Sequence, residues 1–190
     1  MTTYAALLRG INVGGHRKVP MAELRRLIEG LGHGDVRTHL QSGNAVFSVA
    51  GRNAAGVTTE SRTDALAASL GRAVEEHFGF TVPVLVRDHS YLRAVVEDCP
   101  FPTAGLEGRQ LHVTYLSEPV EAARFAALDR STFLPDEFRI GDRALYLYVP
   151  DGLGRSRLAE ALGRPALWRD TVATSRNWNT VIRLVEMTRG

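Results

Sequence analysis

The stretch RGINVGG, from Arg9 to Gly15, places three glycines, an asparagine and an arginine directly after the first apolar run of the chain. Glycine lets backbone amides approach a ligand closely, and Arg9, Arg17 and Lys18 add positive charge, so these residue types suit the binding of an anion. Two of the glycines have the spacing of the phosphate-binding pattern GxxxxGKS or GxxxxGKT, but His16 and Arg17 replace its last two residues. This excludes a P-loop and leaves two interpretations: an anion-binding loop, or a connector whose glycines adopt positive φ angles.

A second polar stretch, QSGN, runs from Gln41 to Asn44 between two apolar runs. Serine, glycine and asparagine are the residues that a tight hairpin turn requires, so a turn explains the stretch by itself. If the fold brings this turn next to RGINVGG, then Gln41, Ser42 and Asn44 supply uncharged donors and acceptors to the same cavity.

A third polar stretch, SRNWNT, begins at Ser175. Apolar residues from Trp178 onward recur on one helical face, which predicts a helix over Ser175–Met187 with a hydroxyl side chain as its N-cap. Packing accounts for the tryptophan. Arg176, Asn177 and Asn179 would surround the positive end of the helix dipole, either as ordinary surface residues or as part of a site.

The remaining reactive residue types form no recognisable catalytic pattern. The six histidines show no metal-ligand spacing, and no GxSxG occurs, so we expect neither a metal site nor a serine hydrolase. The single cysteine, Cys99, is expected to be a small, half-buried residue near a helix end. Near Pro150–Leu158, a turn followed by a helix capped by Ser156 explains the glycines, with Arg155 and Arg157 beside them.

Hydrophobic periodicity places these motifs on a regular series of elements. The predicted strands are Tyr4–Leu8, Val36–Leu40, Ala45–Val49, Val82–Arg87, Leu111–Ser117, Glu137–Ile140, Ala144–Val149 and Thr171–Ala173. The predicted helices are one starting at Pro20 and including Leu24 to Leu31, then Leu66–Phe78, Tyr91–Asp98, Val120–Leu128, Ser156–Leu162 and Ser175–Met187. The polar stretch Ala50–Arg62 is expected to be an exposed, mobile loop.

This order of elements predicts an α+β protein made of two tandem ferredoxin-like (βαββαβ) units, each followed by a helix. Prolines and a glycine near residues 99–105 suggest a division into 1–100 and 105–190. In such a unit the first two strands run in the same direction and the third returns antiparallel beside the first. RGINVGG and QSGN are therefore expected at the same end of the sheet, with Asn44 near Arg9.

Composition places few limits on function. The 190 residues are 44% hydrophobic and 23% charged, with a net charge of +2, which is typical of an ordinary globular protein. This small charge permits a nucleic-acid partner without indicating one. We expect a cytoplasmic protein with no membrane partner, because no stretch approaches the roughly 18 apolar residues of a membrane helix and no leader-like start is apparent.

Taken together, the motifs resemble the widespread bacterial family known as domain of unknown function 1697. The resemblance rests on ALLRGINVGG (Ala6–Gly15), KVPMAELR (Lys18–Arg25), LQSGNAVF (Leu40–Phe47), YLYVPDGLGRSRL (Tyr146–Leu158) and ATSRNWNTV (Ala173–Val181). It runs nearly end to end, and the chain departs by Ser175, where the family more often has threonine, and by a longer loop over Ala50–Arg62. It implies a two-part α+β protein and brings no established activity, cofactor or catalytic residue.

Three functional hypotheses follow. The first is a protein that binds an anionic or phosphorylated small ligand between RGINVGG and QSGN, with SRNWNT as a further wall. The second is an enzyme at the same cleft, with His16 or His39 as acid or base. The third is a nucleic-acid-binding protein, for which Tyr4 and Phe47 are the available stacking aromatics. The predicted ligand-binding residues are Arg9, Asn12, Gly14, Gly15, Lys18, Gln41, Ser42, Asn44, Arg176, Asn177 and Asn179.

Overall fold

The computed structural model describes residues 1–51 and 58–189 as a mixed α+β protein, as the sequence predicts. The described residues form two four-stranded antiparallel sheets and five α-helices. The chain forms two compact units, which we call the first unit (Met1–Leu92 with Leu184–Gly190) and the second unit (Arg93–Arg183). Both unit boundaries fall within helices, whereas the predicted division lies between residues 100 and 105. None of the described helices is long and apolar enough to cross a membrane.

The sheet of the first unit has the strand order β2-β3-β1-β4, and each neighbouring pair is antiparallel. Its strands are β1 (Thr2–Leu8), β2 (Gly34–His39), β3 (Asn44–Val49) and β4 (Val84–Asp88). In the register of β1 with β3, Leu7 lies opposite Asn44. The end of the first strand and the start of the third are therefore adjacent.

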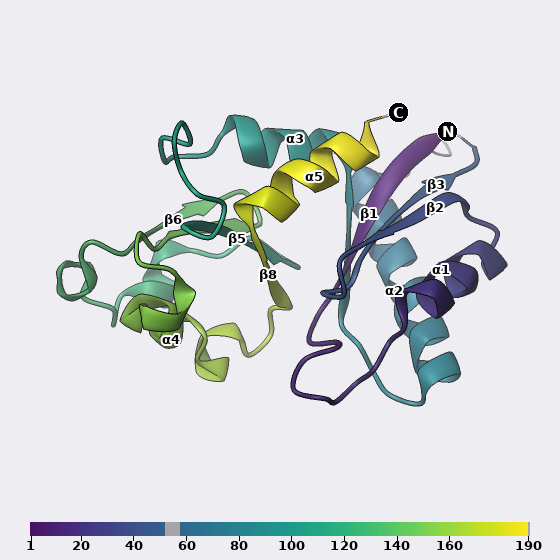
Figure 1. Cartoon of the computed structure of the whole chain (residues 1–190), viewed down its shortest axis with the longest axis horizontal. Helices are drawn as coiled ribbons and strands as arrows, with labels where there is room; N and C mark the ends of the chain where they lie inside the picture. The colour runs from purple at the N-terminus through teal and green to yellow at the C-terminus, as the bar shows by residue number, and fades with distance from the viewer. Residues whose placement is uncertain (52–57, 190) are drawn as a thin grey trace. The chain divides into compact units, whose positions relative to one another are not determined.

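Two helices cover one face of this sheet (Figure 1). They are α1 (Met21–Gly30) and α2 (Thr59–Phe78). Leu24 and Ile28 of α1 pack with Leu70 and Val74 of α2 in the core, as expected from their helical spacing. The loop predicted to run to Arg62 ends earlier, because Thr58 Oγ1 accepts a hydrogen bond from Ser61 N and starts α2. Residues 52–57 of that loop lie outside the described residues.

The sheet of the second unit repeats this arrangement, with the order β6-β7-β5-β8 and antiparallel neighbours. Its strands are β5 (Leu111–Leu116), β6 (Glu137–Gly141), β7 (Ala144–Tyr148) and β8 (Ala173–Asn177). Strand β8 is longer than the predicted Thr171–Ala173, because Ser175 and Arg176 pair with β5.

The covering layer of the second unit is less regular. It contains α4 (Arg157–Leu162), capped by Ser156 as predicted, and four short 3₁₀ segments. These segments are η1 (Ala122–Phe125), η2 (Arg130–Phe133), η3 (Leu153–Arg155) and η4 (Pro165–Trp168). The predicted helix Val120–Leu128 is wrong. Only Ala122–Phe125 of this stretch is helical, as the 3₁₀ segment η1, and the Arg124 guanidinium donates to Leu167 O at 2.9 Å.

Each sheet's last strand leads directly into a helix through a polar cap. Helix α3 (His89–Glu97) follows β4, and Asp88 Oδ1 accepts from Tyr91 N at 2.9 Å. Helix α5 (Trp178–Thr188) follows β8, and Asn177 Oδ1 accepts from Thr180 N at 2.9 Å. The predicted helix start at Ser175 is therefore wrong by three residues, because strand pairing continues to Asn177 before the helix is capped.

Candidate functional site

RGINVGG and QSGN meet at one end of the first sheet, where β1 ends and β3 begins, as the predicted topology requires. Leu8 N donates to Gly43 O at 2.8 Å, and Arg9 N donates to Pro83 O at 2.9 Å. These bonds join the end of β1 to the starts of β3 and β4. We call residues 9–18 and 40–44 the loop edge.

RGINVGG folds into a small hairpin of its own. Gly14 and Gly15 have φ angles of 62° and 79°, and they lie between Val13 and His16, which form a β-bridge. Positive φ at both central residues is the geometry of a type I′ turn, for which two glycines are favoured. The connector interpretation therefore explains these glycines. Because both residues are exposed and a β-carbon there would meet nothing within 4 Å, their backbone remains accessible to a ligand.

Asn12 joins this hairpin to the QSGN turn. Its Nδ2 donates to Val19 O at 3.0 Å and to Gln41 O at 2.8 Å, while its Oδ1 accepts from Val19 N at 2.9 Å. Both amide hydrogens are thus used within the protein. Asn12 holds the two loops together and is not free to hydrogen-bond a ligand through its Nδ2.

Asn44 has a comparable role inside the QSGN turn. Its side chain is fully buried, and its Nδ2 donates to His39 O at 2.9 Å and to Ser42 Oγ at 3.0 Å. Gly43 has a φ of 80°, and a β-carbon there would lie 2.9 Å from side-chain atoms of Leu8 and Ile11. The turn therefore packs against the end of β1 too closely to admit a side chain at this position.

The loop edge also concentrates unusual backbone conformations. Three residues other than glycine have positive φ angles here: 56° at Asn12, 49° at Arg17 and 58° at Leu40. Such conformations cost on the order of 1 kcal/mol each and persist only where the surroundings hold them. The bonds from Asn12 and Asn44 provide that support. Strained residues cluster at functional sites, so this concentration favours the loop edge as a candidate site.

The exposed charges at the loop edge are all positive. Arg9, Arg17 and Lys18 are exposed, and none of their side chains makes a hydrogen bond or ion pair with the part of the chain that the structure describes. Residues 9–18 and 40–44 contain no acidic residue. The loop edge therefore presents unneutralised positive charge, which attracts an anion.

The predicted residues of SRNWNT belong to the second unit and have structural roles there. Arg176 lies in β8, where its Nη1 donates to Thr174 Oγ1 and to Ser175 O, both at 2.8 Å. Burial lowers the pKa of Arg176 to about 10, and the nearby Tyr115 acts in the opposite direction. Asn177 caps α5. Asn179 is exposed, and its side chain covers Gly108 so closely that a β-carbon would not fit there.

The histidine, cysteine and aromatic side chains singled out from the sequence differ in how far they are exposed. His16 is exposed on the hairpin, and His39 is half-buried. Burial raises the pKa of Cys99, which is half-buried as expected and unfavourable as a thiolate nucleophile. Tyr4 and Phe47 belong to the buried core beneath α1 and α2, so they cannot stack on bases. Among the described residues, no group of three or more His, Cys, Asp or Glu could hold a metal ion.

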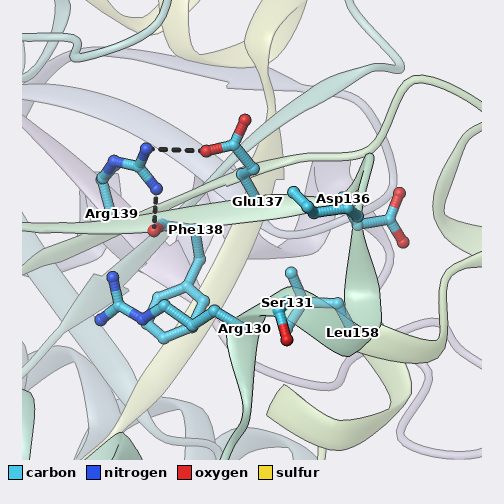
Figure 2. A pocket seen from close by; sticks show the side chains of 8 residues that line it. Arg130, Ser131, Asp136, Glu137, Phe138, Arg139 and Leu158 are labelled. Carbon is cyan, nitrogen blue, oxygen red and sulfur yellow. Dashed lines mark hydrogen bonds and ion pairs between the residues drawn. The ribbon is translucent and has the colours of Figure 1, made fainter.

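Sequence reasoning missed a cavity in the second unit, shown in Figure 2. It has a volume of about 340 Å³ and lies among η2, β6 and Leu158 of α4. The Arg130 guanidinium lies 4.3 Å from the centre of the Phe138 ring, and Arg139 Nη2 donates to Glu137 Oε2 at 2.7 Å. Two arginines and two carboxylates line the cavity, so its charge is balanced. The only sequence signal was an irregular polar stretch before the predicted strand Glu137–Ile140.

Comparison with known families identifies the chain. A model of the family described as "Protein of unknown function (DUF1697)" matches residues 1–146. The chain belongs to this family. That match contains all of RGINVGG and QSGN, so the loop edge lies within the matched residues.

The fold of this DUF1697 protein also occurs in a solved structure, described as "The structure of conserved bacterial protein SP0830 from Streptococcus pneumoniae". The two chains are 22% identical, the match covers 99% of each, and the TM-score is 0.66. At this identity the similarity establishes the fold alone. No curated protein matches the chain.

Proposed function

We propose that this chain binds a phosphorylated small ligand at the loop edge of the first unit. The observation that carries the proposal is a set of exposed cationic side chains, those of Arg9, Arg17 and Lys18. They have no side-chain partner among the described residues, and residues 9–18 and 40–44 contain no acidic residue. A phosphate group supplies the missing negative charge and accepts hydrogen bonds from guanidinium and ammonium groups.

The loop-edge residues divide into contacts and supports. Arg9 and Lys18 contribute charge, the backbone of Gly14 and Gly15 lies open to the ligand, and the exposed Gln41 side chain adds a neutral donor. Ser42 can still donate its hydroxyl hydrogen while it accepts from Asn44. Asn12 and Asn44 act through the loops that they hold. Arg176, Asn177 and Asn179 of the second unit are not needed for the proposal.

The test is titration calorimetry with pyrophosphate and with ribose 5-phosphate. We expect Arg9→Ala and Lys18→Ala each to weaken binding about 2- to 5-fold, since an exposed charge contact is worth up to about 1 kcal/mol and tenfold corresponds to about 1.4 kcal/mol. Arg72→Ala, which removes an exposed arginine of α2 in the same unit, is the matched control and should leave binding unchanged. Affinity should also fall as salt is added.

Other outcomes separate the alternatives. Failure of both ligands to bind at millimolar concentration, or an equal loss in Arg72→Ala, would overturn the proposal. If a short oligonucleotide binds more tightly than either ligand, with a steep salt dependence, nucleic acid is the better assignment. Turnover of ribose 5-phosphate that is lost in His16→Ala would instead favour an enzyme.

Two broader proposals accompany this one. Both units are ferredoxin-like, which is supported by their shared strand order, although the second unit replaces most helical cover with 3₁₀ segments. The protein acts in the cytoplasm, which is supported by its having a single cysteine and thus no internal disulfide.

A further inference from the structure

The loop edge contains exposed aliphatic side chains as well as cations. Val13 is 68% exposed and Leu40 is 57% exposed, and both are among the few large hydrophobic residues that the described surface leaves uncovered. Leu40 also has a positive φ of 58°, which is uncommon for a bulky residue. Binding of a phosphate group accounts for the cations but not for these two side chains.

The two aliphatic residues come from loops that are fastened together. Val13 follows Asn12 in the chain and Leu40 precedes Gln41, and Asn12 Nδ2 donates to Gln41 O at 2.8 Å. The cations Arg17 and Lys18 lie on the same hairpin as Val13. Aliphatic and positive groups are therefore carried on the same pair of joined loops.

We propose that the phosphate bound at the loop edge belongs to an anionic phospholipid surface, an inference that rests on the proposed function. Arg9, Arg17 and Lys18 contact the headgroups, while Val13 and Leu40 enter the boundary between headgroups and acyl chains. A nucleotide or nucleic acid would favour an exposed aromatic side chain for stacking, whereas aliphatic side chains next to cations match a lipid surface. The sequence predicts no membrane partner because no stretch is long and apolar enough to cross a membrane. Contact with the lipid surface does not require such a stretch.

The test is co-sedimentation with vesicles of phosphatidylcholine alone and of phosphatidylcholine mixed with phosphatidylserine. We expect the protein to bind only the mixed vesicles. The double variant Val13→Ser, Leu40→Ser should weaken this binding about tenfold or more, because apolar contact is lost, while its calorimetric affinity for pyrophosphate stays unchanged. Leu31→Ser is the matched control: Leu31 is 39% exposed, follows α1 in the same unit, and should affect neither measurement.

The two proposals fail in different ways. Binding of pyrophosphate without binding of the mixed vesicles would overturn the lipid inference and leave the proposed function standing. Binding of neither would overturn both. Equal vesicle binding by the protein and the double variant would also overturn the inference, because contact would then be electrostatic alone. An unchanged circular dichroism spectrum verifies that the variants fold, as expected for substitutions at exposed positions.

Discussion

The first strands of the two units, β1 and β5, end with the same backbone hydrogen bonds but differ in the charges that lie there. In each unit the strand closes with two equivalent backbone hydrogen bonds to its neighbours. These are Leu8 N–Gly43 O and Arg9 N–Pro83 O in the first unit, and Leu116 N–Arg143 O and Ser117 N–Val172 O in the second. Arg9 therefore occupies the position that Ser117 occupies in the second sheet.

Charge distinguishes these matched edges. In the second unit, Thr171 Oγ1 donates to Glu118 Oε1 at 2.6 Å and accepts from Arg124 Nη1 at 3.1 Å. An acid and a cation are thus connected within the unit itself. In the first unit, Arg9 makes no such connection with the described residues. The same backbone frame can hold an internally bonded polar network or leave positive charge available for a ligand.

The layers that cover the two sheets also differ, in the length and type of their helices. Helices of 10 and 20 residues cover the first sheet, whereas a 6-residue helix and 3₁₀ segments cover the second. Short 3₁₀ segments present side chains less regularly than α-helices, so they fill the space above a sheet less evenly. The cavity beside Phe138 lies against one of them, η2.

The largest difference in stability between the two units is expected at Asn44, whose counterpart in the second unit is the apolar Ala144. Asn44→Ala should lower the free energy of unfolding by about 2–3 kcal/mol, because it removes a fully buried side chain and the hydrogen bonds that it donates to His39 O and Ser42 Oγ. Urea unfolding measures this value. Gln41→Ala, at an exposed amide side chain in the same turn, should stay within about 0.5 kcal/mol of the unchanged protein. Equal losses in the two variants would contradict a special role for Asn44.

A smaller loss of stability is expected at a feature that the two units share, the polar cap between the last strand and its helix. Asp88→Ala and Asn177→Ala each remove an N-cap, of α3 and α5 respectively, and should each cost about 1 kcal/mol in urea unfolding. The loss at Asp88 should be greater by about 0.3 kcal/mol at low salt, because a carboxylate also interacts with the helix dipole. If added salt leaves that difference unchanged, the dipole contribution is wrong.

The smallest effect concerns one histidine in each unit. Burial lowers the pKa of His33 and of His112, and the bond from His112 Nε2 to Arg109 O partly opposes the shift. The unfolded chain then binds protons more readily, so stability is complete above about pH 6.5 and is lost as pH falls through the lowered pKa. The Tm should decrease from pH 7 to pH 5 in calorimetry. His33→Gln and His112→Gln should each flatten this decrease, and an unaltered slope in both would exclude these histidines as its cause.

Local signals predicted the part of the site that local chemistry determines. The glycines of RGINVGG and the residues of QSGN specify their turns through φ preferences, and the order of elements places the turns at one edge. Features that depend on distant partners could not be predicted. Asn12 binds a carbonyl 29 positions away, and the pairing of Arg176 with β5 extends a strand where helical periodicity predicts a helix. Whether a cation is neutralised also depends on every neighbour in the fold.

The hydrogen bonds of Asn12 determine which loop-edge side chains can be substituted. Its side-chain amide contacts backbone atoms of Val19 and Gln41, and no other side chain takes part in those bonds. Side chains at Val13, His16 and Gln41 can therefore be exchanged without loosening the frame that presents them. The loop edge is suited to grafting, in which new recognition residues are placed on an unchanged pair of loops.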